Sequence, residues 1–464
     1  MMTKNLFKKP IWYLMVLTAG MLFTFTSCDD DDDPVLNDSN DITSFVFNDL
    51  SPAVSATISG TTITAEVPYD ADITSLTPTI EVSDAASVSP ASGTTIDFTN
   101  PVTFTVTAED GTTQDYTATI TVAPIPTSVI TPVWERTLAS GGLPEWFTAN
   151  NDRDIAASGD YVYVHNNNDK IRVLDITDGT DVMVRDTVDY IDGKENYASG
   201  NLFLLGMDVD SQGKILASNL RVGSADQFPW YVYKWDNKDA EQELLINYPT
   251  PEGYRLGENL AVAGDITTDA YVYVPGSGFG TESNEVLKFS ISNGEANNTP
   301  EMIVLDGITN MGNAPDVQPL SADADANLIV TGTGVGIREY TSTGSLVGQL
   351  PESLNDGENA PLFAFALDIH PFELDGRKLI ATTATDFTAN AADAGWLYII
   401  DYTDGWENIT ADNVTRYAFT PEGNIDTNFN GTGGVDVIVN GSTATVYAMI
   451  TNFGVAAFDV TIDQ

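Results

Sequence analysis

A pattern of apolar strands that recurs six times beyond residue 133 constrains the fold of this 464-residue chain more than any other feature. Each recurrence has an apolar strand, a turn with Asp or Gly, a second strand, a variable loop and a third strand. The second strands lie at 161–164, 215–217, 271–274, 328–330, 379–381 and 445–447, about 50–65 residues apart. A period of this length marks a unit that cannot bury its apolar surface alone and must stack on copies of itself.

The third strands complete the repeating unit. They follow at 171–175, 231–235, 286–289, 336–340, 397–401 and 455–459. A four-stranded antiparallel blade of this length is the unit of β-propellers. We therefore predict an all-β fold with a six-bladed propeller over residues 133–464, with seven blades as the alternative. The sixth recurrence stops after its third strand, so we expect the unassigned strand 133–138 to supply the fourth strand of that blade and close the ring.

Aspartates in the turns before the second strands support the propeller. Residues 208–214 and 323–327 resemble the Asp-rich hairpins of six-bladed propellers. Asp and Asn side chains stabilise such turns by bonding the backbone of the turn itself. The same spacing could indicate a calcium loop, but the loop glycine and the distal bidentate glutamate are missing. We predict no metal and no cofactor.

Residues 41–123 have a different composition, rich in Thr, Val, Ile and Ser and without Lys, Arg or Trp. Alternation of apolar and polar residues at 61–67, 102–108 and 116–122 predicts about seven short strands in an antiparallel sandwich. The Ala-Glu-Asp-Gly-Thr…Tyr ending resembles that of the Ig-like modules of Bacteroidetes surface lipoproteins, and this resemblance implies a spacer. Three prolines then predict a stiff linker over 124–132.

The N-terminus has the pattern of an export signal. Lysines precede an apolar stretch at 11–25, which is short for a membrane span and suits a signal peptide over 1–27. The only cysteine, Cys28, follows at the position that resembles the lipidated cysteine of bacterial lipoproteins. Five aspartates begin an acidic linker over 28–40 and resemble the surface-export signal of Bacteroidetes lipoproteins. The resemblance implies a lipid anchor on Cys28 and a place on the outer membrane, facing the exterior.

Composition narrows the classes of function. With 67 acidic and 19 basic side chains the formal charge is −48, so nucleic acid is not an expected partner. One Cys excludes a disulfide framework and a Cys-rich zinc site. The two histidines, His165 and His370, fall at opposite faces of the predicted propeller, which argues against a shared catalytic site. No nucleophile elbow, zinc-protease helix or phosphate loop occurs in the sequence.

One face of the predicted propeller gathers aromatic residues in its loops. Loops from second to third strands and loops between blades share that face. The candidate ligand-binding residues on it are Trp146, Phe147, Arg153, Phe228, Trp230, Phe279, Phe387, Trp396 and Phe453. An aromatic ring stacks on the apolar face of a sugar while polar neighbours bond its hydroxyls, and the same residue types are enriched at protein interfaces. The rings could equally fill gaps between blades.

The anchor and the modular layout resemble the accessory surface glycan-binding lipoproteins of Bacteroidetes nutrient-uptake systems. The resemblance implies a non-catalytic protein whose propeller binds an extracellular glycan. Two alternatives stay open, a propeller glycoside hydrolase or polysaccharide lyase, and an adhesion or assembly protein that binds a protein partner. Two carboxylates about 5–10 Å apart in a funnel at the axis would favour hydrolysis, and an aromatic platform would favour binding.

Overall fold

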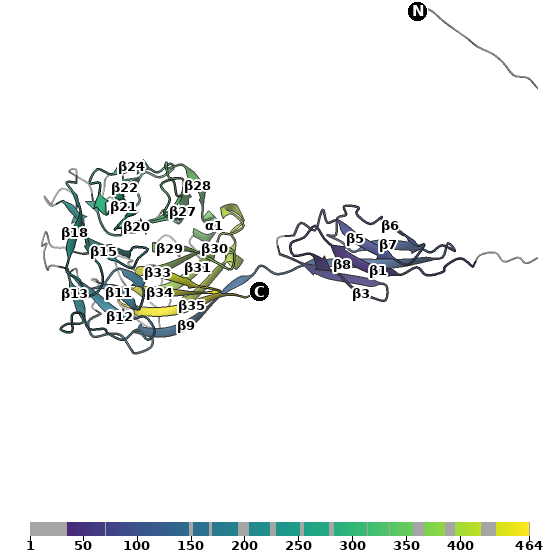
Figure 1. Ribbon diagram of the computed structural model, residues 1–464, viewed down its shortest axis with the longest axis horizontal. Coiled ribbons are helices and arrows are strands. Elements are labelled where there is room, and N and C mark those ends of the chain that lie inside the picture. The colour runs from purple at the N-terminus through teal and green to yellow at the C-terminus, as the bar shows by residue number, and fades with distance from the viewer. Residues whose placement is uncertain are drawn as a thin grey trace, which may run out of the picture. The chain divides into compact units, whose positions relative to one another are not determined.

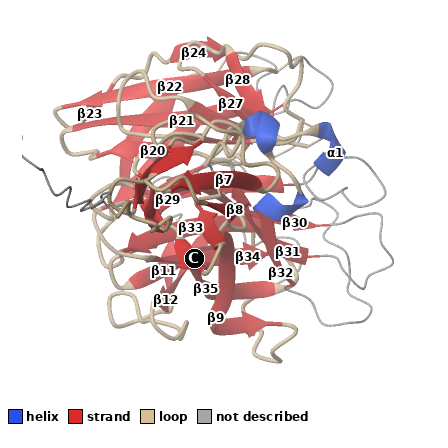
Figure 2. Cartoon of the chain, turned by 90° about the vertical axis from the view of Figure 1, so that its right-hand side faces the viewer, coloured by secondary structure: helices blue, strands red, loops and turns tan. Residues whose placement is uncertain are grey.

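A computed structural model describes residues 35–463 except for 70, 148–151, 167–168, 194–203, 223–228, 251–254, 278–282, 313, 334, 356–365, 386–394 and 419–432. The predicted signal peptide, Cys28 and the aspartate run lie outside the described residues. The chain forms two compact units, Met1–Pro124 and Ile125–Gln464. Strands dominate both units (Figure 2), and the described helical segments are the short α1 (Glu352–Asn355), η2 (Trp406–Asn408) and η3 (Ala411–Asn413).

The first unit is a β-sandwich of two sheets. One sheet has the order β2 (Val54–Ser55), β1 (Ile42–Phe47), β5 (Pro78–Val82). The other has the order β3 (Thr57–Ser59), β4 (Thr62–Val67), β8 (Thr113–Val122), β7 (Val102–Thr107), β6 (Ser87–Ser89). Alternate residues of β8 are buried, as the sequence pattern predicts. Four phenylalanines, Phe45, Phe47, Phe98 and Phe104, pack mostly edge to face in the core.

The second unit consists of six antiparallel sheets around a common centre (Figure 1). The first three sheets are β10 (Ile155–Ser158), β11 (Tyr161–Asn166), β12 (Lys170–Asp175), β13 (Tyr190–Asp192); β14 (Met207–Val209), β15 (Ile215–Ser218), β17 (Trp230–Trp235), β18 (Glu243–Tyr248); and β20 (Ala261–Gly264), β21 (Asp269–Ser277), β22 (Glu285–Ser292), β24 (Glu301–Val304). Short strands β16 (Arg221–Val222), β19 (Arg255–Leu256) and β23 (Glu295–Ala296) extend the third sheet.

The remaining three sheets complete the circle. They are β25 (Asp316–Pro319), β26 (Leu328–Thr331), β27 (Arg338–Tyr340), β28 (Leu346–Gln349); β29 (Ala366–Leu374), β30 (Arg377–Thr385), β31 (Gly395–Asp401), β32 (Val414–Ala418); and β33 (Gly433–Asn440), β34 (Thr443–Ile450), β35 (Gly454–Asp463), β9 (Thr127–Thr137). The innermost strands contact one another in the order β10, β14, β20, β25, β29, β33 and back to β10. The predicted six-bladed propeller is confirmed, and the seven-bladed alternative is wrong because blade six contacts blade one.

Strand β9 closes the ring as the fourth strand of blade six. It pairs antiparallel with β35, from Thr137 opposite Gly454 to Thr127 opposite Asp463. The prediction of a closing strand is confirmed, but the predicted linker over 124–132 is corrected, because β9 begins at Thr127. Pro132 fits into this strand because the register shifts there, opposite Ala457 and Phe458, and a proline is tolerated at such an irregularity on an outer strand.

In the Asp-rich turn 208–214, the carboxylate of Asp210 accepts hydrogen bonds from backbone N–H groups. Asp210 Oδ1 accepts the N–H groups of Gln212 (2.9 Å) and Lys214 (2.8 Å), and Oδ2 accepts that of Ile266 in the next blade (3.0 Å). One side chain therefore shapes its own turn and ties two blades together. Within the described ranges, no group of three or more His, Cys, Asp or Glu residues is arranged to hold a metal ion.

Candidate functional site

The structure divides the nine predicted ligand-binding residues into three groups. Phe228, Phe279 and Phe387 lie outside the described residues. Phe147, Trp230 and Phe453 are buried, with exposed fractions of 7%, 0% and 0%. Trp146, Arg153 and Trp396 are half-buried. Of the predicted aromatic residues in the described part of the chain, Trp146 and Trp396 therefore keep the most surface for a ligand.

The three buried rings correct the sequence interpretation. Trp230 packs against Leu216 of its own blade and Phe289 of the next, with 5.4 Å between the Trp230 and Phe289 ring centroids. Phe453 lies in the core between blades five and six, and Phe147 in the core between blades six and one. These rings fill the gaps between blades, which is the alternative that the sequence left open, and they present no surface to a ligand.

Trp146 is surrounded by charged and aromatic side chains, which together form the Trp146 patch (Trp146, Arg136, Arg172, Tyr190 and Asp181). The guanidinium carbons of Arg172 and Arg136 lie 5.2 and 6.0 Å from the indole centroid. The indole Nε1–H donates to Asp181 Oδ1 at 2.7 Å. Arg172 also lies 5.3 Å from the ring of Tyr190. Cation–π contacts of this kind contribute about 0.5–1 kcal/mol at exposed sites and orient the ring.

Ring closure brings the patch together from two blades. Arg136 lies near the end of β9 in blade six, whereas Arg172 and Tyr190 are cross-strand partners on β12 and β13 of blade one. Two ion pairs hold the arginines, Arg136 to Asp181 at 3.0 Å and Arg172 to Asp189 at 2.6 Å. The patch thus combines a half-exposed aromatic surface with hydrogen-bonding groups of fixed orientation.

Trp396 forms a separate and simpler feature. It lies on β31 of blade five, opposite Ala418 of β32. The guanidinium carbon of Arg416 lies 4.4 Å from its ring centroid. The two half-exposed tryptophans therefore belong to different blades, and the predicted single platform becomes two positions.

The two histidines occupy different surroundings. His165 is 1% exposed on β11, and burial, with the nearby charge of Arg153, lowers its pKa to about 3. It is therefore neutral at physiological pH. Burial also lowers the pKa of Arg153, which Glu258 partly offsets. His370 is half-buried at the axis, where its Nδ1 lies 3.0 Å from Asp436 Oδ1.

Five aspartates line the axis: Asp154, Asp208, Asp316, Asp368 and Asp436. Only the segment of Asp208 was named from the sequence, as an Asp-rich turn, and the structure places Asp208 on the first strand of blade two instead. Each accepts a backbone N–H from the first strand of the next blade, donated by Met207 (2.5 Å), Val262 (2.7 Å), Ile369 (3.1 Å), Val435 (2.7 Å) and Ala157 (2.6 Å), respectively. A signal for them exists, because each is an Asp followed by Ile or Val at the start of a repeat. Their evident role is to join neighbouring blades.

The axial carboxyls are crowded around one small cavity. Burial raises the pKa of Asp154 and Asp368 well above the usual range and that of Asp208 to about 8. The neighbouring charges of Asp316 and Asp154 add to the effect of burial on the pKa of Asp368. The cavity that they share with His370 has a volume of only about 10 Å³. That is no more than one water molecule occupies, so no sugar ring fits beside these carboxyls.

The raised pKa of Asp208 predicts a pH dependence of stability. An unfolded Asp titrates near 3.9, so the stabilising effect of the folded-state proton is complete below that pH and is lost as the pH rises toward 8. The raised pKa of His370, where Asp436 outweighs the effect of burial, acts in the same direction. We expect the free energy of unfolding to fall by roughly 3 kcal/mol between pH 5.5 and 8.5, measured by urea denaturation. Asp208→Asn, the control, should flatten this profile, and an equal slope in that variant would contradict the assignment.

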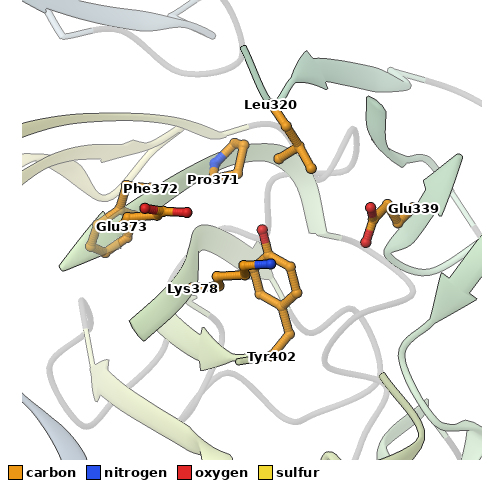
Figure 3. A pocket seen from close by; sticks show the side chains of 7 residues that line it. All are labelled: Leu320, Glu339, Pro371, Phe372, Glu373, Lys378 and Tyr402. Carbon is orange, nitrogen blue, oxygen red and sulfur yellow. The ribbon is translucent and has the colours of Figure 1, made fainter. Parts of the chain in front are cut away.

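A larger pocket lies on the face of the propeller opposite the Trp146 patch, at the turns that join the first and second strands of each blade. It is lined by Leu320, Glu339, Pro371, Phe372, Glu373, Lys378 and Tyr402 (Figure 3) and has a volume of about 200 Å³. Blade four contributes Leu320 and Glu339, and blade five the rest. Sequence analysis assigned no role to these residues, since they come from five separate positions along two blades.

The fold defines a two-unit all-β protein, a β-sandwich followed by a propeller. The family described as "Domain of unknown function (DUF8500)" matches residues 200–454. This is more than half of the chain, which therefore belongs to that family. The family described as "SGBP, N-terminal" matches residues 42–120, the β-sandwich. No match is found among curated proteins.

One solved structure supports the fold. A DUF4623 family protein from Bacteroides eggerthii DSM 20697 shares 14% identity, with 92% of this chain and 99% of that chain covered and a TM-score of 0.53. BamB from Moraxella catarrhalis shares 14% identity over 88% and 90% of the two chains (TM-score 0.29), and the soluble aldose sugar dehydrogenase from Escherichia coli 10% over 73% and 99% (TM-score 0.35). The last two scores are too low to carry an argument. In the part of the chain that the structure describes, none of the helices has the length and apolar character needed to cross a bilayer.

Proposed function

We propose that this protein is a non-catalytic cell-surface protein that binds an extracellular glycan and is held on the outer membrane through a lipid on Cys28. The observation that carries the proposal is the match of the β-sandwich to "SGBP, N-terminal", the N-terminal domain of surface glycan-binding proteins. The sequence pattern around Cys28 supports the anchor. The sandwich would act as a spacer, and the propeller would carry the ligand.

The Trp146 patch is the glycan-contacting surface that we propose. Its half-exposed indole offers an apolar face, while Asp181 and Tyr190 offer hydrogen-bonding groups beside the ring and the buried Arg172 holds the ring in place. The ion pairs of the patch limit side-chain motion, which reduces the entropy lost on binding. Trp396, stacked with Arg416, would provide a second contact.

The axial geometry favours binding over hydrolysis. A glycoside hydrolase needs two carboxyls on either side of a sugar ring. The axial aspartates instead accept backbone N–H groups across blade boundaries, around a cavity of about 10 Å³. The carboxyls at the axis are therefore structural, and we expect no hydrolysis of a glycan there.

Replacement of Trp146 by Ala tests the proposed surface. We expect the affinity for the bound polysaccharide, found on a glycan array with the mature protein, to fall about tenfold, or ~1.4 kcal/mol. The half-buried position of Trp146 should keep the melting temperature close to that of the wild type. Trp146→Phe, the matched control, keeps an aromatic face and should retain most of the binding, measured by isothermal titration calorimetry.

Three results would count against the proposal. Unchanged affinity in Trp146→Ala would remove the patch from the site. Release of shorter sugars from the polysaccharide would show catalysis. If the protein bound no glycan on the array but bound a purified surface protein tightly through the Trp146 patch, a protein partner would be favoured. Trp, Tyr and Arg are also enriched in protein interfaces.

A further inference from the structure

The pocket between blades four and five has the features of a preformed small-ligand site. Phe372 and Tyr402, 9% and 7% exposed, and the partly exposed Pro371 provide apolar surface. Glu339 and Glu373 stand on opposite sides of the cavity, with Tyr402 and Lys378 between them (Figure 3). The lining thus combines apolar and polar surface in comparable amounts, which suits a ligand that carries hydroxyl groups around an apolar ring.

The position of Tyr402 is fixed by its backbone and its ring. Its N–H donates to Lys378 O at 3.0 Å, and the N–H of Lys378 donates to Thr403 Oγ1 at 2.7 Å. Arg377 pairs with Asp401 at 2.6 Å and so holds the same turn. The ring of Tyr402 lies 5.0 Å from that of Trp406. The hydroxyl therefore needs little reorganisation to meet a ligand.

Glu339 is fixed on the opposite side by two hydrogen bonds. Asn327 Nδ2 donates to its Oε1 and Trp406 Nε1 donates to its Oε2, each at 2.7 Å. Each carboxylate oxygen has a second lone pair, so Glu339 can still accept a ligand hydroxyl. Gly348 makes room for Trp406, because a Cβ at Gly348 would lie 2.3 Å from the indole Cδ1. Gly348 therefore allows Trp406 to reach Glu339, and Trp406 in turn fixes the orientation of the Glu339 carboxylate.

Volume and charge restrict the ligand. A volume of about 200 Å³ lies below the usual range of about 300–1,000 Å³ for pockets that hold drug-sized ligands, so the pocket suits a ligand as small as one sugar ring. Two carboxylates and one ammonium face the cavity, in a chain whose formal charge is −48. An acidic sugar would meet net repulsion.

We propose that this pocket binds one neutral sugar unit, with the ring against Phe372 and Tyr402 and the hydroxyls on Tyr402, Lys378 and the two glutamates. The inference rests on the proposed function and deepens it by naming a ligand class and a second site, on the opposite face from the loops. Binding of a polysaccharide at the Trp146 patch and binding of a single sugar unit in this pocket would be independent of each other.

Titration with free monosaccharides tests this inference. The mature protein is titrated with glucose, galactose, mannose and N-acetylglucosamine, and with glucuronate and galacturonate, by ligand-observed NMR and calorimetry. We expect millimolar dissociation constants for at least one neutral sugar, as befits a ligand of this size, and at least tenfold weaker binding of the uronates. Tyr402→Phe and Lys378→Ala should each weaken binding fivefold or more, while Lys214→Ala, a control on blade two, should have no effect.

The outcomes separate this inference from the proposed function. Absence of neutral-sugar binding, a preference for uronates, or full binding by both pocket variants would overturn it. Polysaccharide binding that is lost in Trp146→Ala but intact in Tyr402→Phe, with no monosaccharide bound, would overturn the pocket and leave the glycan-binding proposal standing. Neutral-sugar binding that persists in Trp146→Ala and is lost in Tyr402→Phe would support it. Thermal melts of both variants check that the fold is retained.

Discussion

A chain that begins at Ala139, and so lacks β9, is expected not to form a stable propeller. β9 supplies the outer strand of blade six and pairs with β35 along its whole length. Its Trp134 is 8% exposed, packs near Tyr447 of β34 with 6.5 Å between ring centroids, and donates from Nε1 to Ile176 O of blade one at 3.0 Å. Removal of the strand leaves the backbone of β35 unpaired and opens the contact between the last and first blades.

The expected loss of free energy exceeds 5 kcal/mol, since the indole of Trp134 alone accounts for about 3–5 kcal/mol and a typical domain has only about 5–15 kcal/mol in total. A chain that begins at Ile125 is the matched control. It lacks the sandwich but keeps β9, and the two compact units separate at that point. Circular dichroism and urea denaturation of the two truncated chains give the comparison. Cooperative unfolding of the shorter chain at wild-type urea concentrations would show that closure is dispensable.

Trp230→Ala is expected to destabilise the propeller by about 3–5 kcal/mol, the usual cost of removing a large buried aromatic side chain. Trp230 is fully buried between blades two and three, against Leu216, Leu256 and Phe289. A cavity there would weaken the contact between two blades. Urea denaturation at constant pH measures the loss. Trp146→Ala is the control for a half-exposed tryptophan, for which we expect a smaller loss of about 1–2 kcal/mol from two cation–π contacts and one hydrogen bond.

Binding to the polysaccharide distinguishes the two tryptophans. The folded fraction of Trp230→Ala should bind with wild-type affinity, because the ring has no exposed surface. If that variant kept its stability and lost its binding, Trp230 would belong to the ligand site as the sequence suggested, and the packing described above would be wrong.

Much of the fold could be predicted from the order of residues. The spacing of the second strands predicts six blades, and the surplus strand before the first blade predicts the closure, because an unpaired edge at the end of a ring is costly. The linker was mispredicted because prolines at 124–132 indicate stiffness, whereas the register shift that accommodates Pro132 depends on the partner strand β35. Local sequence does not reveal that partner.

The candidate site was less predictable. An aromatic residue at the start of a third strand can point to the loops or into the gap between blades, and the alternation along one strand is the same in both cases. Trp230 and Phe453 point into the gaps between blades, whereas Trp146 contacts two arginines that come from two different blades. The axial position of the five aspartates was not predicted, because any five of the 67 acidic residues are hard to distinguish from the others by sequence. A repeated Asp-Ile or Asp-Val pair does mark them.

By itself the sequence determined the all-β class, the number of blades and the strand that closes them, because these follow from periodicity and from the pairing of backbone groups along the chain. Only the tertiary structure decided which aromatic rings are buried, how Arg136 and Arg172 meet over Trp146, and that Glu339 and Tyr402 face one cavity. The physical reason is that the burial of a side chain, and its contacts, depend on the neighbouring blade. That blade lies about 50 residues or more away in the sequence, and its packing depends on the shapes of the side chains at the blade interface.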